Sequence, residues 1–216
     1  MNSGLRKYVV VIGATNLDIN FLNKNKIIIN ESNIGNLTLS AGGVARNISE
    51  NIVKLGNECH LVSVFGNDIF SEFLKRDCRK KNIIIENSIF LKNEPSSTYI
   101  SINNQKGEMK YGFNDTSIMD NLNIDHIKKL YKLISTSSAI VIETNISQKV
   151  FKFLIKTFKE IPIFVDTVST IKSKKILPFL KNIYFLKPNF NEAKKLLNLD
   201  NKNNISKKNI SQKLHL

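Results

Sequence analysis

The chain has few of the residues that build disulfides and metal sites. Its two cysteines, Cys59 and Cys78, form no Cys-x-x-Cys pair, and its three histidines show no metal-ligand spacing. Long apolar runs are missing as well, because the run from Val9 to Ile12 is far too short for a signal-peptide core or a membrane span. We therefore expect a soluble, cytoplasmic protein with no structural zinc and no membrane partner.

Acidic residues are scarce: 18 Asp and Glu stand against 32 Lys and Arg, which gives a formal net charge of +14. Such a charge indicates a nucleic-acid partner only where it is clustered, and here the lysines are spread along the whole chain without a recognised binding motif. A role as a basic nucleic-acid-binding protein therefore ranks last. A basic surface could still attract anionic substrates such as nucleotides.

Short β-branched runs alternate with amphipathic segments, and 216 residues with 42% hydrophobic content suit one globular domain. After Gly43, apolar residues recur at helical spacing up to Gly56, which stands at a C-cap position, and Asp68 can cap the next helix. This pattern predicts a mostly parallel sheet with helices on both faces. The other expected strands are 8–12, 60–65, 139–142, 163–166 and 183–186, the other expected helices are 124–134, 147–158, 170–177 and 191–197, and two β excursions lie at 16–40, with β-rich pieces at 27–29 and 37–39, and at 97–113.

Polar residues follow the expected strands at the edge of the sheet where ligands bind in open parallel folds. In the first such loop, Asp18 could accept hydrogen bonds from two vicinal hydroxyls, although an aspartate in a turn is more often structural. In the second, Gly42 and Gly43 precede a helix that has Asn47 in its first turn. Glycines let a ligand approach the backbone, and a helix N-terminus favours electron-rich groups, whereas the plainer interpretation is a tight turn.

Two later loops leave the same choice open. In the loop 165–172, Lys172 can reach back to the strand ends or can be an ordinary solvated lysine. In the loop 186–192, Asn189 can be a helix N-cap with Glu192 as its capping-box partner. Equally, these two side chains can hold magnesium-bound water and phosphate oxygens.

In this order, the loops resemble those of the ribokinase-like (phosphofructokinase B) carbohydrate kinases, over the chain from about Tyr8 to Leu199. Gly42-Gly43-x-x-x-Asn47 followed by Gly66-Asn67-Asp68 matches the N-terminal signature of that family, and Asn189-x-x-Glu192 matches its magnesium and phosphate motif. Within the family the chain most resembles the pseudouridine kinases. The shared pieces are Val11 to Asp18, Gly42 to Ile48, Gly107 to Met109 with Asn114 and Asp115, Asn145 to Ser147, Val165 to Ser169 with Lys172, and Leu186 to Asn189.

The resemblance implies an α/β fold, a ribokinase-like three-layer sandwich with a mostly parallel central sheet and a small β lid, C-terminally truncated. Residues 1–199 would be the kinase domain, with lid segments at about 17–40 and 97–115 that fold over the sugar. Residues 200–216 are polar and low in complexity, so we expect a disordered tail there. Because lids in this family sometimes pair, a homodimer stays open.

The resemblance also implies the site and its ligands, a nucleoside or sugar together with ATP and Mg²⁺. Glu143 stands where the pseudouridine group is expected to have aspartate. Glu192 would reach the metal through water. The implied substrate-binding residues are Asn16, Asp18, Gly42, Gly43, Asn47, Asp115, Glu143, Asn145 and Lys172, and the implied cofactor-binding residues are Asn189 and Glu192.

The expected catalytic base is not found. The family carries it in a C-terminal Gly-Ala-Gly-Asp motif, whereas the only aspartate after Asp166 is Asp200, which has no glycine near it. We therefore expect a chain without the C-terminal part and with an uncovered sheet edge, from a frameshifted or split gene, a shortened fragment or a pseudokinase. The leading hypothesis is an ATP-dependent sugar or nucleoside kinase, above all a pseudouridine kinase, inactive or incomplete as this chain; the alternative is a nucleoside-binding pseudokinase without catalysis.

Overall fold

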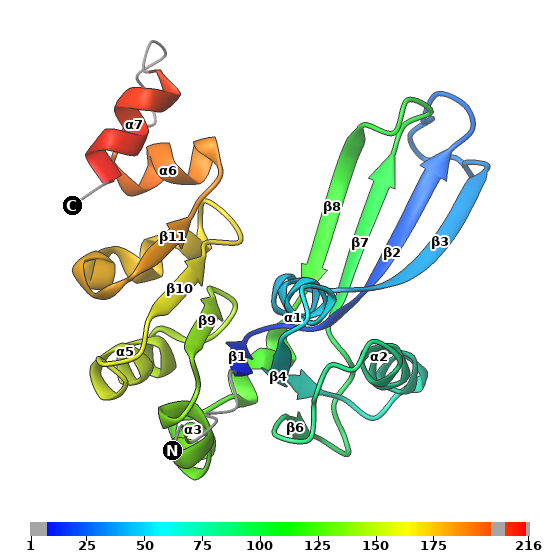
Figure 1. Cartoon of the computed structure of the whole chain (residues 1–216). Coiled ribbons are helices and arrows are strands. Elements are labelled where there is room, and N and C mark those ends of the chain that lie inside the picture. Colours follow the sequence, from blue (N-terminus) through cyan, green and yellow to red (C-terminus); the bar gives the residue numbers. More distant parts are fainter. Residues whose placement is uncertain (1–7, 200–205, 215–216) are drawn as a thin grey trace.

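The computed structural model describes residues 8–199 and 206–214, and its centre is a five-stranded sheet (Figure 1). The strand order is β11-β10-β9-β1-β4, and every neighbouring pair is parallel. The strands are β1 (Tyr8–Ile12), β4 (Glu58–Val62), β9 (Ala139–Glu143), β10 (Ile163–Asp166) and β11 (Phe185–Lys187).

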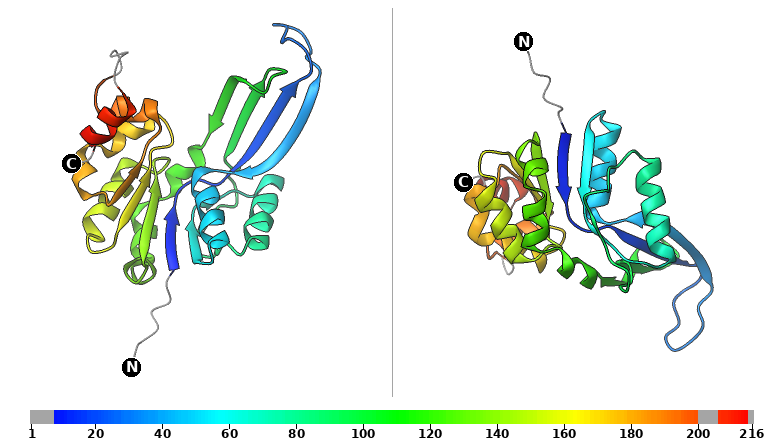
Figure 2. Two further views of the ribbon diagram at one scale, coloured as in Figure 1. Left: turned by 45° about the horizontal axis from the view of Figure 1, so that its top comes forward. Right: turned by 90° about the horizontal axis from the view of Figure 1, so that it is seen from below.

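Helices cover both faces of this sheet, and side chains on both faces of the strand β1 are buried beneath them. Val10 and Ile12 pack in one apolar cluster with Phe151, whereas Val11 packs in a second cluster with Leu74. The result is the predicted three-layer α/β sandwich, seen from two directions in Figure 2. On the first face lie α3 (Ile124–Lys129), α5 (Gln148–Thr157) and the 3₁₀ helix η2 (Lys172–Asn182), and α6 (Phe190–Leu196) follows along the chain. On the second face lie α1 (Val44–Lys54) and α2 (Ile69–Lys80). The short elements are α4 (Tyr131–Ser135), η1 (Ser117–Asn121), β5 (Val64–Phe65) and β6 (Ile89–Phe90).

The two β excursions form a separate four-stranded sheet that projects from the sandwich (Figures 1 and 2). Its order is β3-β2-β7-β8, with β2 (Asn16–Asn23), β3 (Gly35–Gly42), β7 (Thr98–Asn103) and β8 (Met109–Asp115). This is the small β lid of the predicted fold. Since β2 follows β1 after only three residues and β3 leads into α1, the base of the lid lies at the carboxyl end of β1.

Helix ends agree with the sequence signals. Asp68 caps α2 by accepting the backbone N–H of Ser71 at 2.7 Å. Gly56 has a φ of 83° just after α1, the left-handed conformation that ends helices at glycine.

Four expectations differ from the structure, and the first is the helix expected at 124–134, which divides at Leu130 into α3 and α4. Residues 27–29, expected to be β-rich, form no strand, and Ile28 and Ile29 are exposed in the loop between β2 and β3. The helix expected at 170–177 is a longer 3₁₀ helix, η2, which contains Pro178, a residue without a backbone donor. The strand expected at 60–65 divides into β4 and β5, and β5 pairs with β6, which the sequence analysis did not anticipate.

The tail also differs where it is described. Residues 200–205 and 215–216 lie outside the described residues, but Lys207–Leu214 form the helix α7 instead of the expected disordered segment. Its Ile210 is buried in a small apolar cluster with Ala193 and Leu199, which is the burial that a disordered tail would lack.

The strand β11 lies at the end of the central sheet, with Tyr184 and Phe185 exposed beside it. Across the residues that the structure describes, no helix has the length and apolar character needed to cross a membrane.

Candidate functional site

Glu143 organises the loops at the carboxyl ends of β1 and β9. Its side chain is fully buried at the end of β9, and its Oε1 accepts the backbone N–H of Ala14 at 2.7 Å while Oε2 accepts the backbone N–H of Asn145 at 3.2 Å. A side chain on Gly13 would overlap Glu143, so the glycine after β1 lets these two loops meet. The burial raises the pKa of Glu143 to about 7, because the hydrogen bonds from Ala14 and Asn145 and the charge of Lys172 only partly offset the loss of water.

Lys172 reaches this carboxylate through Asn145. The Lys172 Nζ donates to Asn145 Oδ1, and the Asn145 side-chain amide donates to Glu143 Oε2. Burial lowers the pKa of Lys172, while the charge of Glu143 raises it. Lys172 is therefore no freely solvated lysine, and the structure joins three of the predicted site residues in one hydrogen-bonded chain.

Asp18 stands at the base of the lid, on β2. The Asn16 side-chain amide donates to Asp18 Oδ1 at 3.2 Å, and a side chain on the neighbouring Gly42 of β3 would overlap the carboxylate. Burial raises the pKa of Asp18, opposed by the Asn16 hydrogen bond and by the charge of Arg46. The carboxylate is held in place but only half-buried, as a group that accepts hydrogen bonds from a ligand must be.

Gly43 brings the start of α1 against the loop after β1. Its φ is 96°, and a side chain there would overlap the backbone of Ala14 and Thr15, so both its conformation and its surroundings require glycine. Asn47 follows in the first turn of α1 and is exposed, with its backbone N–H bonded to the Gly43 carbonyl at 2.9 Å. The Gly42–Gly43 pair is therefore more than a tight turn, because it packs the helix start onto the strand loop that leads to Asp18.

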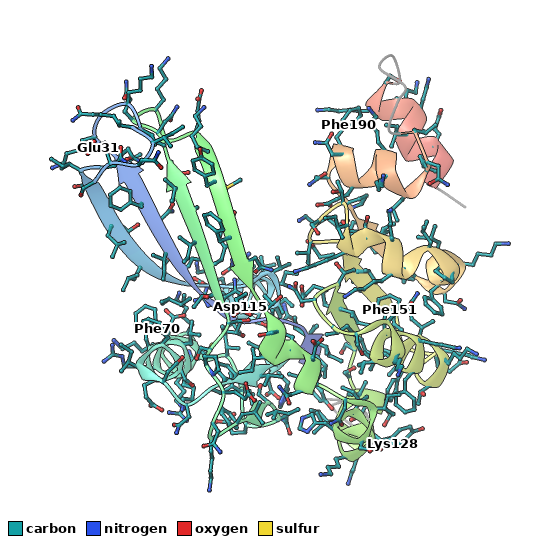
Figure 3. All side chains as sticks on the ribbon, turned by 180° about the vertical axis from the view of Figure 1, so that it is seen from behind. Glu31, Phe70, Asp115, Lys128, Phe151 and Phe190 are labelled. Carbon is teal, nitrogen blue, oxygen red and sulfur yellow. The ribbon has the colours of Figure 1, made fainter. Side chains whose placement is uncertain are left out.

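Asp115 ends β8 at the junction between the lid and the sandwich (Figure 3). It is exposed, and its Oδ1 accepts the Ser117 hydroxyl at 2.7 Å and the Ser117 backbone N–H at 3.1 Å, which together lower its pKa. The described hydrogen bonds of this carboxylate are local and do not join it to the other candidates. Its role toward a nucleobase or ribose stays a prediction.

Asn189 and Glu192 form a complete capping box at the start of α6. Asn189 Oδ1 accepts the Glu192 backbone N–H at 2.9 Å, while Glu192 accepts from the Asn189 backbone N–H at 2.8 Å, from the Asn189 amide at 2.7 Å and from the Thr167 hydroxyl at 2.5 Å. The predicted helix-capping role of Asn189 and Glu192 is thus confirmed.

A direct metal ligand at Glu192 does not fit this arrangement. Both carboxylate oxygens are engaged inside the protein, and the side chain is nearly buried. Among the described residues, no group of three or more His, Cys, Asp or Glu side chains could hold a metal ion. Contact between Glu192 and Mg²⁺ through water stays a prediction.

Glu192→Ala should destabilise the protein by roughly 2–3 kcal/mol, because it leaves the Thr167 hydroxyl and the Asn189 backbone N–H without their acceptor. Urea unfolding measures this loss, and Glu160→Ala, which removes an exposed carboxylate, is the matched control with little expected change. An unfolding curve for Glu192→Ala that overlays that of the control would contradict the structural role.

Arg46 lies within the shared segment Gly42 to Ile48, and no role was predicted for it from the sequence. It lies beside Asn47 on α1 but is buried, and its guanidinium donates to the Asn47 side chain and pairs with Glu50 and Asp77. An arginine next to the motif asparagine, four residues before a glutamate, is the signal that the sequence offers for it.

The comparisons with known proteins agree with this fold. The model of the pfkB family of carbohydrate kinases matches residues 6–215. The chain is 30% identical to the pseudouridine kinase of Escherichia coli over 191 residues, which is 88% of this chain and 61% of that protein. It is 32% identical to the uncharacterized sugar kinase YeiI of the same bacterium over 187 residues, 87% of this chain and 52% of that protein.

Solved structures show the same architecture. A carbohydrate kinase from Agrobacterium tumefaciens superposes with a TM-score of 0.82 at 20% identity, covering 97% of this chain and 68% of that one. Ribokinase from Arabidopsis thaliana, complexed with ribose and ATP, gives a TM-score of 0.76 at 18% identity, with the same two shares covered.

The fold is thus that of the ribokinase-like kinases. The chain belongs to the pfkB family of carbohydrate kinases, and it spans between about half and about three fifths of the length of the two Escherichia coli relatives.

Proposed function

We propose that this chain holds a nucleoside, with pseudouridine as the first candidate, for ATP-dependent phosphorylation of its 5′-hydroxyl. The observation that carries the proposal is the Asp18 carboxylate, which is held by Asn16 and lies against Gly42 at the carboxyl edge of the central sheet. A half-buried carboxylate with free acceptor sites suits two vicinal hydroxyls, such as those of ribose. The 30% identity to a pseudouridine kinase supports the choice of nucleoside.

The remaining site residues divide the work of binding. Asn47 would contact the sugar from the start of α1, and the chain from Glu143 through Asn145 to Lys172 would present polar groups from the β9 and η2 side. Because each of these side chains is already held by another, little rotational freedom is lost when a ligand arrives. Among these site residues, Lys172 supplies the positive charge.

Phosphoryl transfer makes further demands. The acceptor hydroxyl must lose its proton, and the charge that develops on the transferred phosphoryl group must be stabilised. The 216 residues contain no Gly-Ala-Gly-Asp motif of the kind that carries the base in this family. We therefore expect this chain alone to bind the nucleoside without phosphorylating it.

Calorimetry followed by a phosphorylation assay tests the proposal. Titration of pseudouridine into the protein should release or absorb measurable heat, and incubation with ATP, Mg²⁺ and pseudouridine should give no 5′-phosphate by chromatography. Clear turnover would refute the expectation that the base is absent. Absence of heat with pseudouridine, uridine and ribose would refute the binding site itself.

A further inference from the structure

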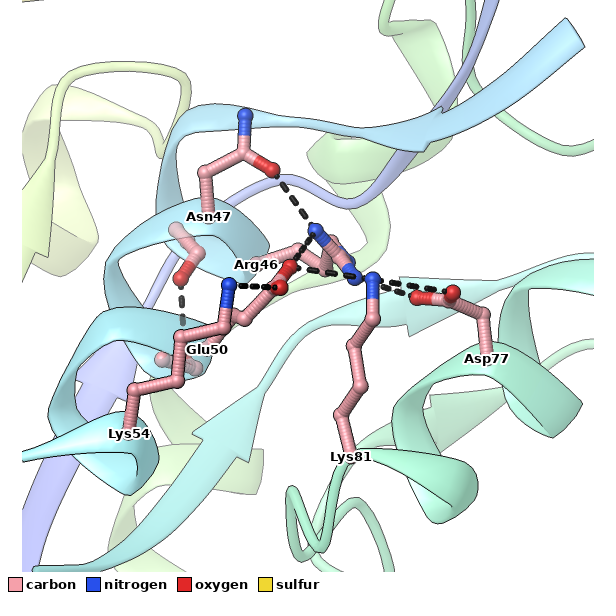
Figure 4. Close-up of polar contacts among 8 residues, drawn as sticks. Arg46, Asn47, Glu50, Lys54, Asp77 and Lys81 are labelled. Carbon is pink, nitrogen blue, oxygen red and sulfur yellow. Dashed lines mark hydrogen bonds and ion pairs between the residues drawn. The ribbon is translucent and has the colours of Figure 1, made fainter. Parts of the chain in front are cut away.

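A charge network centred on one buried arginine lies beside Asn47, between α1 and α2 (Figure 4). The Arg46 guanidinium is its centre, with a side chain that is 3% exposed. One terminal nitrogen, Nη1, lies 2.5 Å from Glu50 Oε2, and the other, Nη2, pairs with Asp77 Oδ2. Lys81 closes the network from outside, 3.0 Å from Glu50 Oε2 and 3.1 Å from Asp77 Oδ1.

One contact of Arg46 is not needed for this charge pairing. Its Nη1 also donates to Asn47 Oδ1 at 2.9 Å. Asn47 is neutral and exposed, so the bond adds nothing to the balance of charges in the interior. The two carboxylates have lysines as further partners, since Lys54 pairs with Glu50 at 2.6 Å and Lys81 pairs with both.

The bond decides which way the Asn47 amide faces. A guanidinium has only donors, so the group turned toward it must be the amide oxygen. Figure 4 shows the Asn47 oxygen directed at Arg46 and the amide nitrogen directed away from it. The two amide protons are thereby left for a ligand.

We propose that Arg46 is a positioning residue, which fixes the Asn47 side chain so that its amide nitrogen donates to a hydrogen-bond acceptor on the bound nucleoside, such as a hydroxyl oxygen of the sugar. The inference rests on the proposed function, because it assigns a chemical role to Asn47 within that site.

Lysine cannot replace arginine in this role. A guanidinium is a rigid planar fork that can serve Asn47, Glu50 and Asp77 from two terminal nitrogens in fixed directions, whereas an ammonium is a single point charge. Arg46→Lys should therefore keep the charge near Glu50 and Asp77 and lose the bond to Asn47. Binding of pseudouridine should weaken about tenfold, the usual size of one such hydrogen bond.

A double-mutant cycle separates positioning from mere stability. If Arg46 acts through Asn47, then Arg46→Lys has almost no further effect on pseudouridine affinity once Asn47→Ala is present. Lys81→Met is the matched control, since it removes one network charge without touching Asn47; it should lower the unfolding temperature and leave the affinity unchanged. If Arg46→Lys does not fold, Asn47→Asp tests the same role. Aspartate still accepts a hydrogen bond from Arg46 but offers no donor to the ligand, so pseudouridine affinity should fall at least about tenfold in a stable protein.

The role of Arg46 can also be measured on the protein without a ligand. The side-chain amide signal of Asn47 in a ¹⁵N–¹H spectrum, assigned by its loss in Asn47→Asp, should be rigid in the wild type and mobile in Arg46→Lys. If pseudouridine binds to no variant, the proposed function fails while this signal still decides the role of Arg46. An Asn47 signal unchanged by Arg46→Lys, or affinity losses that simply add in the cycle, would overturn the proposal.

Discussion

Gly42→Ala is expected to weaken nucleoside binding by about 100-fold while leaving the protein folded. The added methyl group would overlap the Asp18 carboxylate on the neighbouring strand, and the carboxylate, as the flexible partner, must turn away. Two charge-assisted hydrogen bonds to vicinal hydroxyls would be lost or weakened, which is worth about 3 kcal/mol or more. Calorimetry with pseudouridine measures the affinity, and thermal unfolding checks the fold.

The control for Gly42→Ala is the pair Asp18→Ala and Asp18→Ala/Gly42→Ala. The three atoms nearest to the extra methyl group all belong to the Asp18 carboxylate, so without that carboxylate the double variant should bind no worse than Asp18→Ala alone. Gly107→Ala, at a lid turn with no atom near the position of an added methyl group, should lower stability because of its φ of 78° but leave binding unchanged. A Gly42→Ala protein with wild-type affinity would contradict the role given to Asp18.

Glu143 should make the protein less stable as pH rises. Its pKa is about 7 in the folded protein against the ordinary value of 4.5, so the folded state keeps a proton that the unfolded state has already released. Stability is therefore highest below the ordinary value and falls between that value and about pH 7, because ionisation of the buried carboxyl costs more in the folded state. The difference corresponds to roughly 3 kcal/mol.

Urea unfolding at several pH values between about pH 4.5 and pH 8 measures this loss, and Glu143→Gln should flatten it. Lys172→Met is a control with the opposite direction, since removing the nearby charge should raise the pKa of Glu143 further and move the loss of stability to higher pH. A wild-type profile that does not fall over this range, or one that Glu143→Gln leaves unaltered, would contradict the buried and ionisable state of Glu143.

Much of the fold could be predicted because local signals and burial agree. The β-branched strands with both faces apolar, the cap at Asp68 and the glycine at Gly56 each predicted an element that the structure has. The prediction of β structure at residues 27–29 was wrong because these isoleucines, which favour a strand, lie exposed in a loop where no neighbouring strand pairs with them. The helix α7 was missed because the burial of its Ile210 against Ala193 and Leu199 arises from tertiary packing, which composition does not reveal.

In the candidate site, too, some residues could be predicted from the sequence and others could not. Loop position singled out Lys172, whereas Glu143 and Asn145 were implied only by the resemblance to the family, and the structure joins all three by hydrogen bonds. The capping box of Asn189 and Glu192 was also foreseen as an alternative. The role of Arg46 could not be predicted in the same way, because its burial and its partners on α2 depend on how two helices pack.

A crystal structure of the protein with pseudouridine tests the central claim most directly. The account predicts the sugar at the base of the lid, with hydroxyl groups within hydrogen-bond distance of the Asp18 carboxylate and an acceptor oxygen facing the Asn47 amide nitrogen. A nucleoside bound elsewhere, or one that is absent from this site at saturating concentration, would contradict it.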